Sequence, residues 1–367
     1  MKLLFSLFLF PLVLFADNEI IQIKELSQLE KKIATIQEPR FSEAPTTYRD
    51  SASLSEELSP ILQARIAATN YDRVYIWQQF LDHVIHLQRS LLPMESLAYF
   101  YPDLSVNQTR GSACVGLTMD CLFHVPPHIN AYIASAKLPA KFEQKFFPFY
   151  CHTAVLVKFL NLTNPEDRGY LLLDTAFDIT NSLIIKHGSK AFVDMQEKGI
   201  WSFEITHLDG QEVILCRTDL EHLDDQSTWM IYRTDRLVNP IGSSAIPMFL
   251  ADRKPTLLSR NSDGSHIAHL NLDFNRKQIL ITVHNQRCPP VPFEEFLQKE
   301  QYFDDAFASL LFMDAPTLNS YLRSVVDKHA LVDTIYSQYQ EVLRQERYPQ
   351  REDCFSSWMT AVRSMIF

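Results

Sequence analysis

A cysteine flanked by two glycines is the feature of this sequence that most directly indicates chemistry. Cys114 lies in "TRGSACVGLTMD" between Gly111 and Gly116, in a chain that has only 8 glycines among 367 residues. An apolar helical pattern begins at the cysteine, and Gly111 would let the backbone turn into that helix. Because the amide dipoles at a helix N-terminus stabilise a thiolate, Cys114 is the candidate nucleophile.

A histidine and an aspartate on two apolar runs would supply a base and the group that orients it. His152 opens "HTAVLVKF", and Asp174 ends "YLLLD". Buried charge is costly unless it is paired, so two such groups on neighbouring strands predict each other as partners. We expect His152 to take the thiol proton and Asp174 to orient the imidazole.

The two apolar runs are separated by the turn-rich "NLTNPEDR" and together predict a hairpin. If the hairpin is centred near Pro165, His152 lies opposite Asp178 and Asp174 lies opposite Leu156. His152 and Asp174 then share a face but are offset by about 13 Å along the strands. A bulge or an asymmetric loop would close that gap, and Asp178 stays open as the alternative orienting acid.

A second group of side chains has the spacing of metal ligands. Cys121, His124 and His128 follow one another at offsets of 3 and 4, which a helix could gather on one face. Pro126 and Pro127 interrupt that helix, so we interpret the three as ordinary, partly buried side chains. The sequence therefore predicts no metal site.

The residue composition and the spacing of apolar residues change along the chain and predict five segments. Polar residues with three prolines come first, then apolar residues at helical spacing, then a succession of short strand-like runs, then a helical pattern that is clearest over residues 317–345. The predicted segments are a signal peptide at 1–16, a polar lead or linker at 17–60, a helical subdomain with the nucleophile at 61–145, a β-barrel subdomain with the histidine and aspartate at 146–290, and a helical C-terminal region at 291–367.

Charge and hydropathy limit the partners and the compartment. A net charge of −10 and a pI near 5.6 argue against a protein that binds nucleic acid or anionic lipid, since both need a basic face. The start, "MKLLFSLFLFPLVLFADNE", has the lysine, the short apolar run and the small residue of a secretory signal. No other run approaches the roughly 18 apolar residues of a membrane span. We expect an exported chain, periplasmic or secreted, with no span in its mature form.

Several motifs resemble the arylamine N-acetyltransferases, a family of the transglutaminase-like cysteine superfamily. "RGSAC" (110–114) resembles their RGGxC motif, "LLPMESL" (91–97) resembles IPFENL, and "YLLLDTAF" (170–177) resembles the YLVDVGFG strand. Further segments of that family are similar to the "H...LV" pattern at 152–157, to "WMIYR", and to the "NPIGSSAIPMF" stretch with Arg253. The resemblance spans about residues 60 to 290 and is that of a diverged relative with a signal peptide.

The resemblance implies an α+β fold. A helical N-terminal subdomain would carry the cysteine, a central antiparallel β-barrel would carry the histidine and aspartate, and an α/β to helical region would follow, around a papain-like core. It also implies ping-pong acyl transfer, in which Cys114 takes an acetyl or other acyl group from an acyl-CoA co-substrate and a small-molecule amine removes it. His152 would be the general base, Asp174 would fix its tautomer, and the backbone N–H of Cys114 would contribute to an oxyanion hole. No permanently bound cofactor is implied.

The sequence departs from that family near the nucleophile. Ser112 stands where the second glycine is usual, and Gly116 and Thr118 stand where an acidic residue and an asparagine are usual. Ala176 and Asp178 replace glycines after the aspartate. Two other functions therefore stay open. One is an exported transglutaminase-like or papain-like thiol enzyme that cleaves, deamidates or cross-links amides, because acetyl-CoA is a cytosolic donor. The other is an inactive scaffold used for binding.

Overall fold

The computed structural model describes residues 44–48, 50–87, 106, 112–139, 152–177, 179–195, 199–237 and 253–345. The chain divides into two compact units, 1–42 and 43–367, and all described residues lie in the second. The expected signal peptide (1–16), Gly111 and the "LLPMESL" stretch lie outside the described residues. Among the helices that are described, none is long and apolar enough to cross a bilayer.

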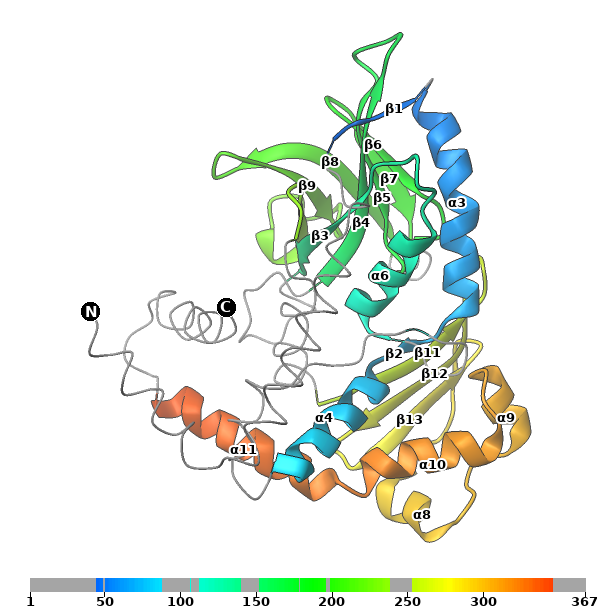
Figure 1. The fold of residues 1–367 in the computed structure, drawn as a ribbon. Coiled ribbons are helices and arrows are strands. Elements are labelled where there is room, and N and C mark those ends of the chain that lie inside the picture. Colours follow the sequence, from blue (N-terminus) through cyan, green and yellow to red (C-terminus); the bar gives the residue numbers. More distant parts are fainter. Residues whose placement is uncertain are drawn as a thin grey trace, which may run out of the picture. The chain divides into compact units, whose positions relative to one another are not determined.

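A nine-stranded, almost entirely antiparallel sheet forms the first layer of the fold (Figure 1). Its strands follow one another in the order β6 (Leu183–Lys186), β5 (Arg168–Leu173), β4 (His152–Asn161), β3 (Tyr132–Lys137), β10 (Trp229–Arg233), β9 (Gln211–Arg217), β8 (Ile200–Leu208) and β7 (Lys190–Asp194), with β1 (Thr46–Tyr48) added in parallel to β4. The two edge strands, β6 and β7, are consecutive in the chain and contact each other without a ladder, so the sheet curls into a nearly closed barrel.

Alternation along the strands fills the barrel interior with apolar and aromatic side chains. In β3 every second residue points inward, and three of these are small or aromatic: Tyr132, Ala134 and Ala136. Gly169 lets β5 and β6 approach closely, since a Cβ there would lie 2.1 Å from the carbonyl oxygen of Ile185. Because the interior is buried, the register of each strand is fixed, and with it which side chains face the barrel interior and its mouth.

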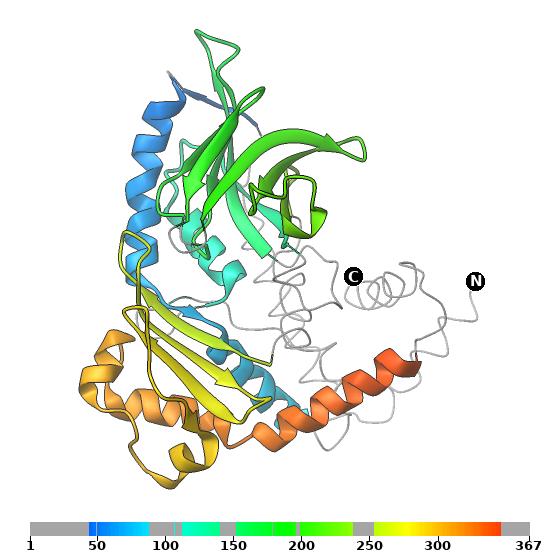
Figure 2. The same ribbon diagram turned by 180° about the vertical axis from the view of Figure 1, so that it is seen from behind.

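A second antiparallel sheet lies apart from the barrel (Figure 2). It consists of β14 (Gln286–Arg287), β13 (Gln278–Val283), β12 (His266–Asp273), β11 (Thr256–Arg260) and β2 (Tyr71–Asp72), with β15 (Val291–Pro292) also paired to β13. The helices that follow this sheet, as far as residue 345, are α8 (Phe293–Gln298), α9 (Asp305–Leu310), α10 (Ala315–Val326) and α11 (His329–Gln345).

In the described part of the chain, helices lie between the strands of the two sheets at α3 (Ser51–Ala68), α4 (Arg73–Leu87) and α6 (Cys114–His124). In α3 the side chain of Asp50 caps the first turn by accepting from Ser53 N–H at 2.7 Å. One residue per turn of α3 is buried, which produces an apolar stripe of Leu54, Leu58, Leu62 and Ile66. The α+β class, with a helix that carries the cysteine and an antiparallel barrel that carries the histidine and aspartate, is confirmed.

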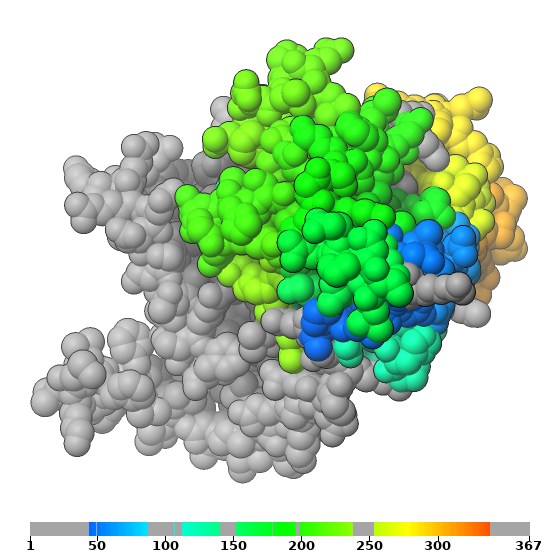
Figure 3. All heavy atoms as spheres, turned by 90° about the horizontal axis from the view of Figure 1, so that it is seen from above, coloured from blue at the N-terminus to red at the C-terminus, as the bar shows by residue number. Residues whose placement is uncertain are grey.

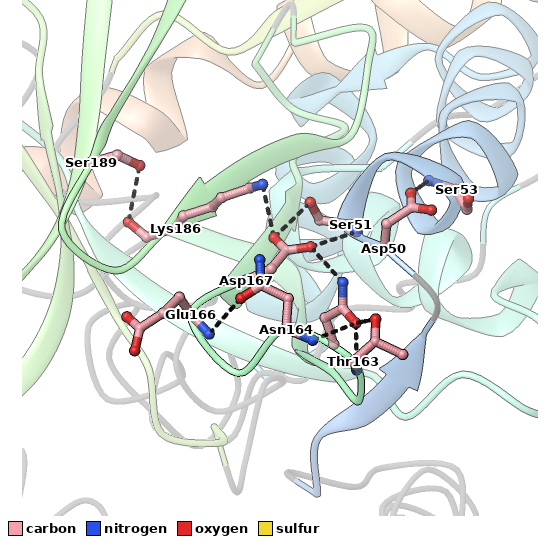
Figure 4. Close-up of polar contacts among 10 residues, drawn as sticks. Asp50, Ser51, Ser53, Thr163, Asn164, Glu166, Asp167, Lys186 and Ser189 are labelled. Carbon is pink, nitrogen blue, oxygen red and sulfur yellow. Dashed lines mark hydrogen bonds and ion pairs between the residues drawn. The ribbon is translucent and has the colours of Figure 1, made fainter.

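Hydrogen bonds tie the start of α3 to the far end of the barrel (Figure 4). The Asp167 carboxylate accepts from the backbone and the hydroxyl of Ser51 at 3.3 and 3.1 Å, from Asn161 Nδ2 at 3.1 Å and from Lys186 Nζ at 2.7 Å. Burial opposes ionisation, but these partners together lower the pKa of Asp167 to about 2. In the space-filling view the blue start of α3 adjoins the green strands (Figure 3). Asp167 therefore fastens a helix to the barrel away from the candidate site.

The observed segments differ from the expected ones at three places. Residues 51–60 belong to α3 rather than to a polar linker, because the capped helix buries its leucines despite Pro60 in its interior. The expected helical subdomain at 61–145 contains strand β3, whose residues alternate between the two faces of the barrel sheet. The expected barrel at 146–290 includes β11 to β14, which pair with β2 in the second sheet instead of extending the barrel.

Candidate active site

Cys114 is the first residue of α6, as the sequence predicts. Ala113 has the extended conformation of an N-cap, and its carbonyl accepts the first helical bond from Leu117 N–H at 3.0 Å. The thiol thus lies where the unpaired N–H groups of the first turn point, and only 5% of the residue is exposed. Most of α6 is buried on several sides, so the helix is held as a rigid support for the sulfur.

The hairpin that carries His152 and Asp174 has a tighter register than the sequence suggested. Leu156 pairs with Leu172, and Val155 pairs with Leu173, so the strands are centred at residue 164 rather than at Pro165. This shift halves the expected offset and places Asp174 diagonally across from His152. No bulge or asymmetric loop is needed, because a diagonal pair is within reach of side chains of this size. Asp178 lies outside the described residues.

The structure brings His152 and Asp174 into direct contact at the mouth of the barrel. His152 Nε2 lies 2.6 Å from Asp174 Oδ2, and both side chains are buried, with 4% and 0% exposed. The other carboxylate oxygen, Oδ1, accepts the backbone N–H groups of Ala176 and Phe177 at 3.1 and 3.2 Å. These two bonds fix the carboxylate plane where β5 ends, so that Oδ2 faces the imidazole.

The electrostatics of this pair favour a protonated imidazole. Burial alone would lower the pKa of His152, but the Asp174 carboxylate and a hydrogen bond with the Cys114 side chain raise it to about 10. Because Nε2 bonds to Asp174, Nδ1 is the nitrogen left to face the thiol. The imidazole thus lies between the sulfur and the carboxylate. This arrangement can hold a thiolate and imidazolium pair at neutral pH.

Tyr232 is a site residue to which the sequence assigned no role. Its hydroxyl donates to Asp174 Oδ2 at 2.9 Å, and its ring lies 6.2 Å from the His152 ring. In the register β10–β3–β4, Tyr232 pairs with Ala136 and Ala136 pairs with His152, so the residue between them in the sheet has only a methyl side chain. Burial and the nearby carboxylate raise the pKa of Tyr232 well above 10, so it stays a donor. The alternation of "WMIYR" could have placed Tyr232 inward, where its hydroxyl needs a partner.

Aromatic rings cover the imidazole on a second side. Phe177 meets the His152 ring edge to face, with centroids 4.8 Å apart, and in turn packs on Trp201 at 5.6 Å. These apolar walls lower the local dielectric around the His152 and Asp174 pair, which strengthens their attraction.

A pair of threonine hydroxyls fastens the helix of the nucleophile to the strand of the base. Thr118, one turn beyond Cys114, donates through Oγ1 to the carbonyl oxygen of Thr153 at 2.9 Å. Thr153 Oγ1 in turn donates to Thr118 Oγ1 at 3.2 Å, and both residues are buried. Because Thr153 adjoins His152, this contact sets how α6 and β4 are aligned, and with them the thiol and the imidazole. The sequence marked Thr118 only as a departure from a family pattern.

The structure does not gather Cys121, His124 and His128. Burial raises the pKa of the Cys121 thiol to about 12, whereas the two histidines are exposed. His124 contacts the carbonyl oxygen of Asp120 at 2.8 Å, and His128 lies 3.0 Å from Glu57. Within the described part of the chain, no three potential ligands lie close enough together to hold a metal ion.

Comparisons with known proteins found similarity at the level of structure alone. No family model and no curated protein matches the chain. Similar solved structures include arylamine N-acetyltransferase C from Bacillus anthracis and an arylamine N-acetyltransferase from Bacillus cereus whose description names a Cys-His-Glu catalytic triad. Each is 12% identical to this chain with a TM-score of 0.40, and each match covers 66% of this chain and 88% of the other. At this distance, a function must be drawn from the geometry of the site itself.

Proposed function

We propose that this chain is a cysteine-dependent acyltransferase that moves an acetyl or other acyl group from a CoA thioester to a small amine. The observation that carries the proposal is the buried imidazole of His152, which contacts Asp174 at 2.6 Å and shares a hydrogen bond with Cys114 at the N-terminus of α6. A thiol, a base and an orienting acid in this order are what nucleophilic acyl transfer requires.

In the first half of the reaction, Cys114 Sγ attacks the thioester carbonyl carbon and forms a tetrahedral intermediate. Backbone N–H groups in the first turn of α6 stabilise the oxyanion. The carbon–sulfur bond to CoA then breaks, and His152 Nδ1 gives its proton to the departing CoA thiolate. The products are an acyl-cysteine, neutral His152 and free CoA.

In the second half, an amine attacks the acyl-cysteine and His152 takes the proton that the amine loses. The bond between carbon and Cys114 Sγ breaks, which regenerates the thiolate beside an imidazolium. Asp174 keeps the ring in the productive tautomer and compensates its charge, while Tyr232 and two backbone amides hold the carboxylate still. No permanently bound cofactor takes part in these steps.

The motif resemblance at "RGSAC" and "YLLLDTAF" favours acyl transfer over other cysteine chemistry. An amide-directed thiol enzyme is the second candidate, because the same three residues would serve it and the apolar N-terminal run indicates export. We propose that the chain is exported on this run, and that it acts on small molecules rather than on nucleic acid or as a membrane-spanning protein.

Labelling with acetyl-CoA tests the proposal. Wild type, Cys114→Ala and Cys288→Ser are incubated with radiolabelled acetyl-CoA and, separately, with iodoacetamide at neutral pH, and the modified peptide is identified by mass spectrometry. Cys288 is exposed and remote in sequence from the site, so its variant is the matched control. Label that is lost in Cys114→Ala and kept in Cys288→Ser supports acyl transfer. Alkylation of Cys114 without acetylation favours the amide-directed enzyme, and neither reaction indicates a binding scaffold.

A further inference from the structure

A buried carboxylate outside the candidate triad lies next to the nucleophile's backbone. Asp72, the last residue of β2, is fully buried. The hydroxyl of Tyr321 in α10 lies 2.7 and 2.8 Å from its two carboxylate oxygens, and Oδ1 also accepts Tyr75 N–H at 2.9 Å. A buried carboxylate is stable only where such donors meet it, so the Tyr321 hydroxyl and Tyr75 N–H both stabilise the Asp72 side chain where it lies.

The backbone of Asp72 is bonded to the segment that leads into Cys114. Asp72 N–H donates to the carbonyl oxygen of Ser112 at 3.0 Å, and Tyr71 and Ser112 form a parallel bridge. Ser112 is fully buried and stands two positions before Cys114. The approach to the nucleophile therefore continues the edge of the second sheet, where β2 pairs with β11.

We propose that Tyr321 and Asp72 are positioning residues for Cys114, and that the C-terminal helix α10 thereby takes part in the reaction. This inference rests on the proposed function of the cysteine. Tyr321 fixes the side chain of Asp72, the backbone of Asp72 fixes Ser112, and Ser112 fixes where α6 begins. The sulfur then meets His152 at the N-terminus of a helix that is supported on either side of its first turn: by β4 through Thr118 after it, and by β2 through Ser112 before it.

The packing of α10 separates this role from ordinary core filling. The helix buries Leu318, Leu322 and Val325 on the same side as Tyr321, so apolar packing already holds it. A phenylalanine at 321 would keep the ring and its contacts but lose the donor to a charged acceptor. The hydroxyl can therefore be removed with little change in the apolar core.

Alkylation of Cys114 in Tyr321→Phe tests the inference independently of any acyl donor. The rate constant for iodoacetamide is measured per folded protein across pH in wild type, Tyr321→Phe and the control Tyr302→Phe, together with the kcat and KM of acyl transfer. Tyr302 is also C-terminal, but its hydroxyl contacts Glu295 at 3.3 Å in an exposed position. We expect alkylation and kcat to fall about three- to tenfold in Tyr321→Phe, with KM unchanged and the pH profile closer to that of an ordinary thiol. Tyr302→Phe should match wild type.

The possible results distinguish this inference from the proposed function. If Tyr321→Phe melts at a lower temperature but keeps the wild-type alkylation rate and pH profile, Tyr321 is only structural and the inference is overturned. If wild type shows no acetylation while Tyr321→Phe still slows alkylation, the acyltransferase proposal fails and the positioning role stands. Should Tyr321→Phe not fold, Asp72→Asn is measured in the same way, and an unchanged profile there overturns the inference.

Discussion

Replacing Thr118 with valine should disturb the alignment of the nucleophile and the base without changing the volume of the side chain. Valine keeps the branched shape but removes the Oγ1 that donates to the Thr153 carbonyl oxygen at 2.9 Å and accepts from the Thr153 hydroxyl at 3.2 Å. Thr118 and Thr153 are both buried. Loss of the Thr118 hydroxyl therefore leaves the Thr153 carbonyl oxygen without this donor and the Thr153 hydroxyl without this acceptor. Each costs roughly 1–3 kcal/mol in principle, and partial rearrangement makes about 2 kcal/mol the expected loss in the free energy of unfolding.

The loss of activity should exceed what this change in stability would cause. At neutral pH a protein of ordinary stability remains folded after losing about 2 kcal/mol. Acyl transfer should nevertheless fall by about tenfold or more, because the helix can shift along β4 and small misplacements of reacting groups are costly. Urea denaturation measures the first quantity, and the rate of acetylation of Cys114 measures the second.

Thr118→Ser is the matched control, because serine keeps the hydroxyl and loses only the methyl group. It should stay close to wild type in acetylation rate while losing some packing energy. If Thr118→Ser were as impaired as Thr118→Val, the methyl group rather than the hydroxyl would matter. If Thr118→Val were destabilised yet fully active, the threonine pair would not set the distance between the thiol and the imidazole, and our reasoning about the alignment would be wrong.

Three further substitutions test the electrostatics. Asp174→Asn removes the charge that raises the pKa of His152, so acyl transfer at pH 7 should fall by about 10²-fold or more; a variant with near-normal activity would exclude Asp174 as the orienting acid. Tyr232→Phe removes one donor to that carboxylate and should lower the free energy of unfolding by about 1.5–3 kcal/mol in urea, whereas an unchanged midpoint would show that the bond is not needed. The pKa of Asp167 is about 2, against 3.8 when unperturbed, which corresponds to about 2 kcal/mol in the free energy of unfolding. This stabilisation is fully present above about pH 5 and is lost as the pH falls toward 1. Asp167→Asn should be less stable than wild type by that amount at pH 7, and the difference should vanish near pH 1. If the difference in the free energy of unfolding persisted in acid, packing rather than the charge of Asp167 would be its cause.

The local elements of the site could be predicted from the sequence, because each has a strong local signal. Helix α6 begins at Cys114, where glycine, a small residue and an apolar period coincide. The hairpin of β4 and β5 follows from two apolar runs around a loop rich in turn residues. The contact of His152 with Asp174 follows from the cost of burying either group alone.

The remainder of the site depends on pairings that leave little trace in a single sequence. Strand β2 has only two residues, and its partners are β11 and Ser112, far along the chain. The hairpin register was wrong by one step because Pro165 was taken as the centre of the loop. The second sheet was assigned to the barrel because alternation indicates a strand but not the sheet to which it belongs. Tyr232 was missed because it approaches His152 through the long-range pairing of β10 with β3.

The bond between Asp72 and Tyr321 joins residues 249 positions apart, so it can form only when most of the chain is present. A nascent chain that has emerged as far as the barrel already contains Cys114, His152 and Asp174, but β2 has no partner strand until β11 has been synthesised, and Asp72 has no hydroxyl until α10 follows. If Asp72 and Tyr321 position Cys114 as proposed above, a chain that ends before α10 should contain the three candidate residues and still lack the full reactivity of the thiol.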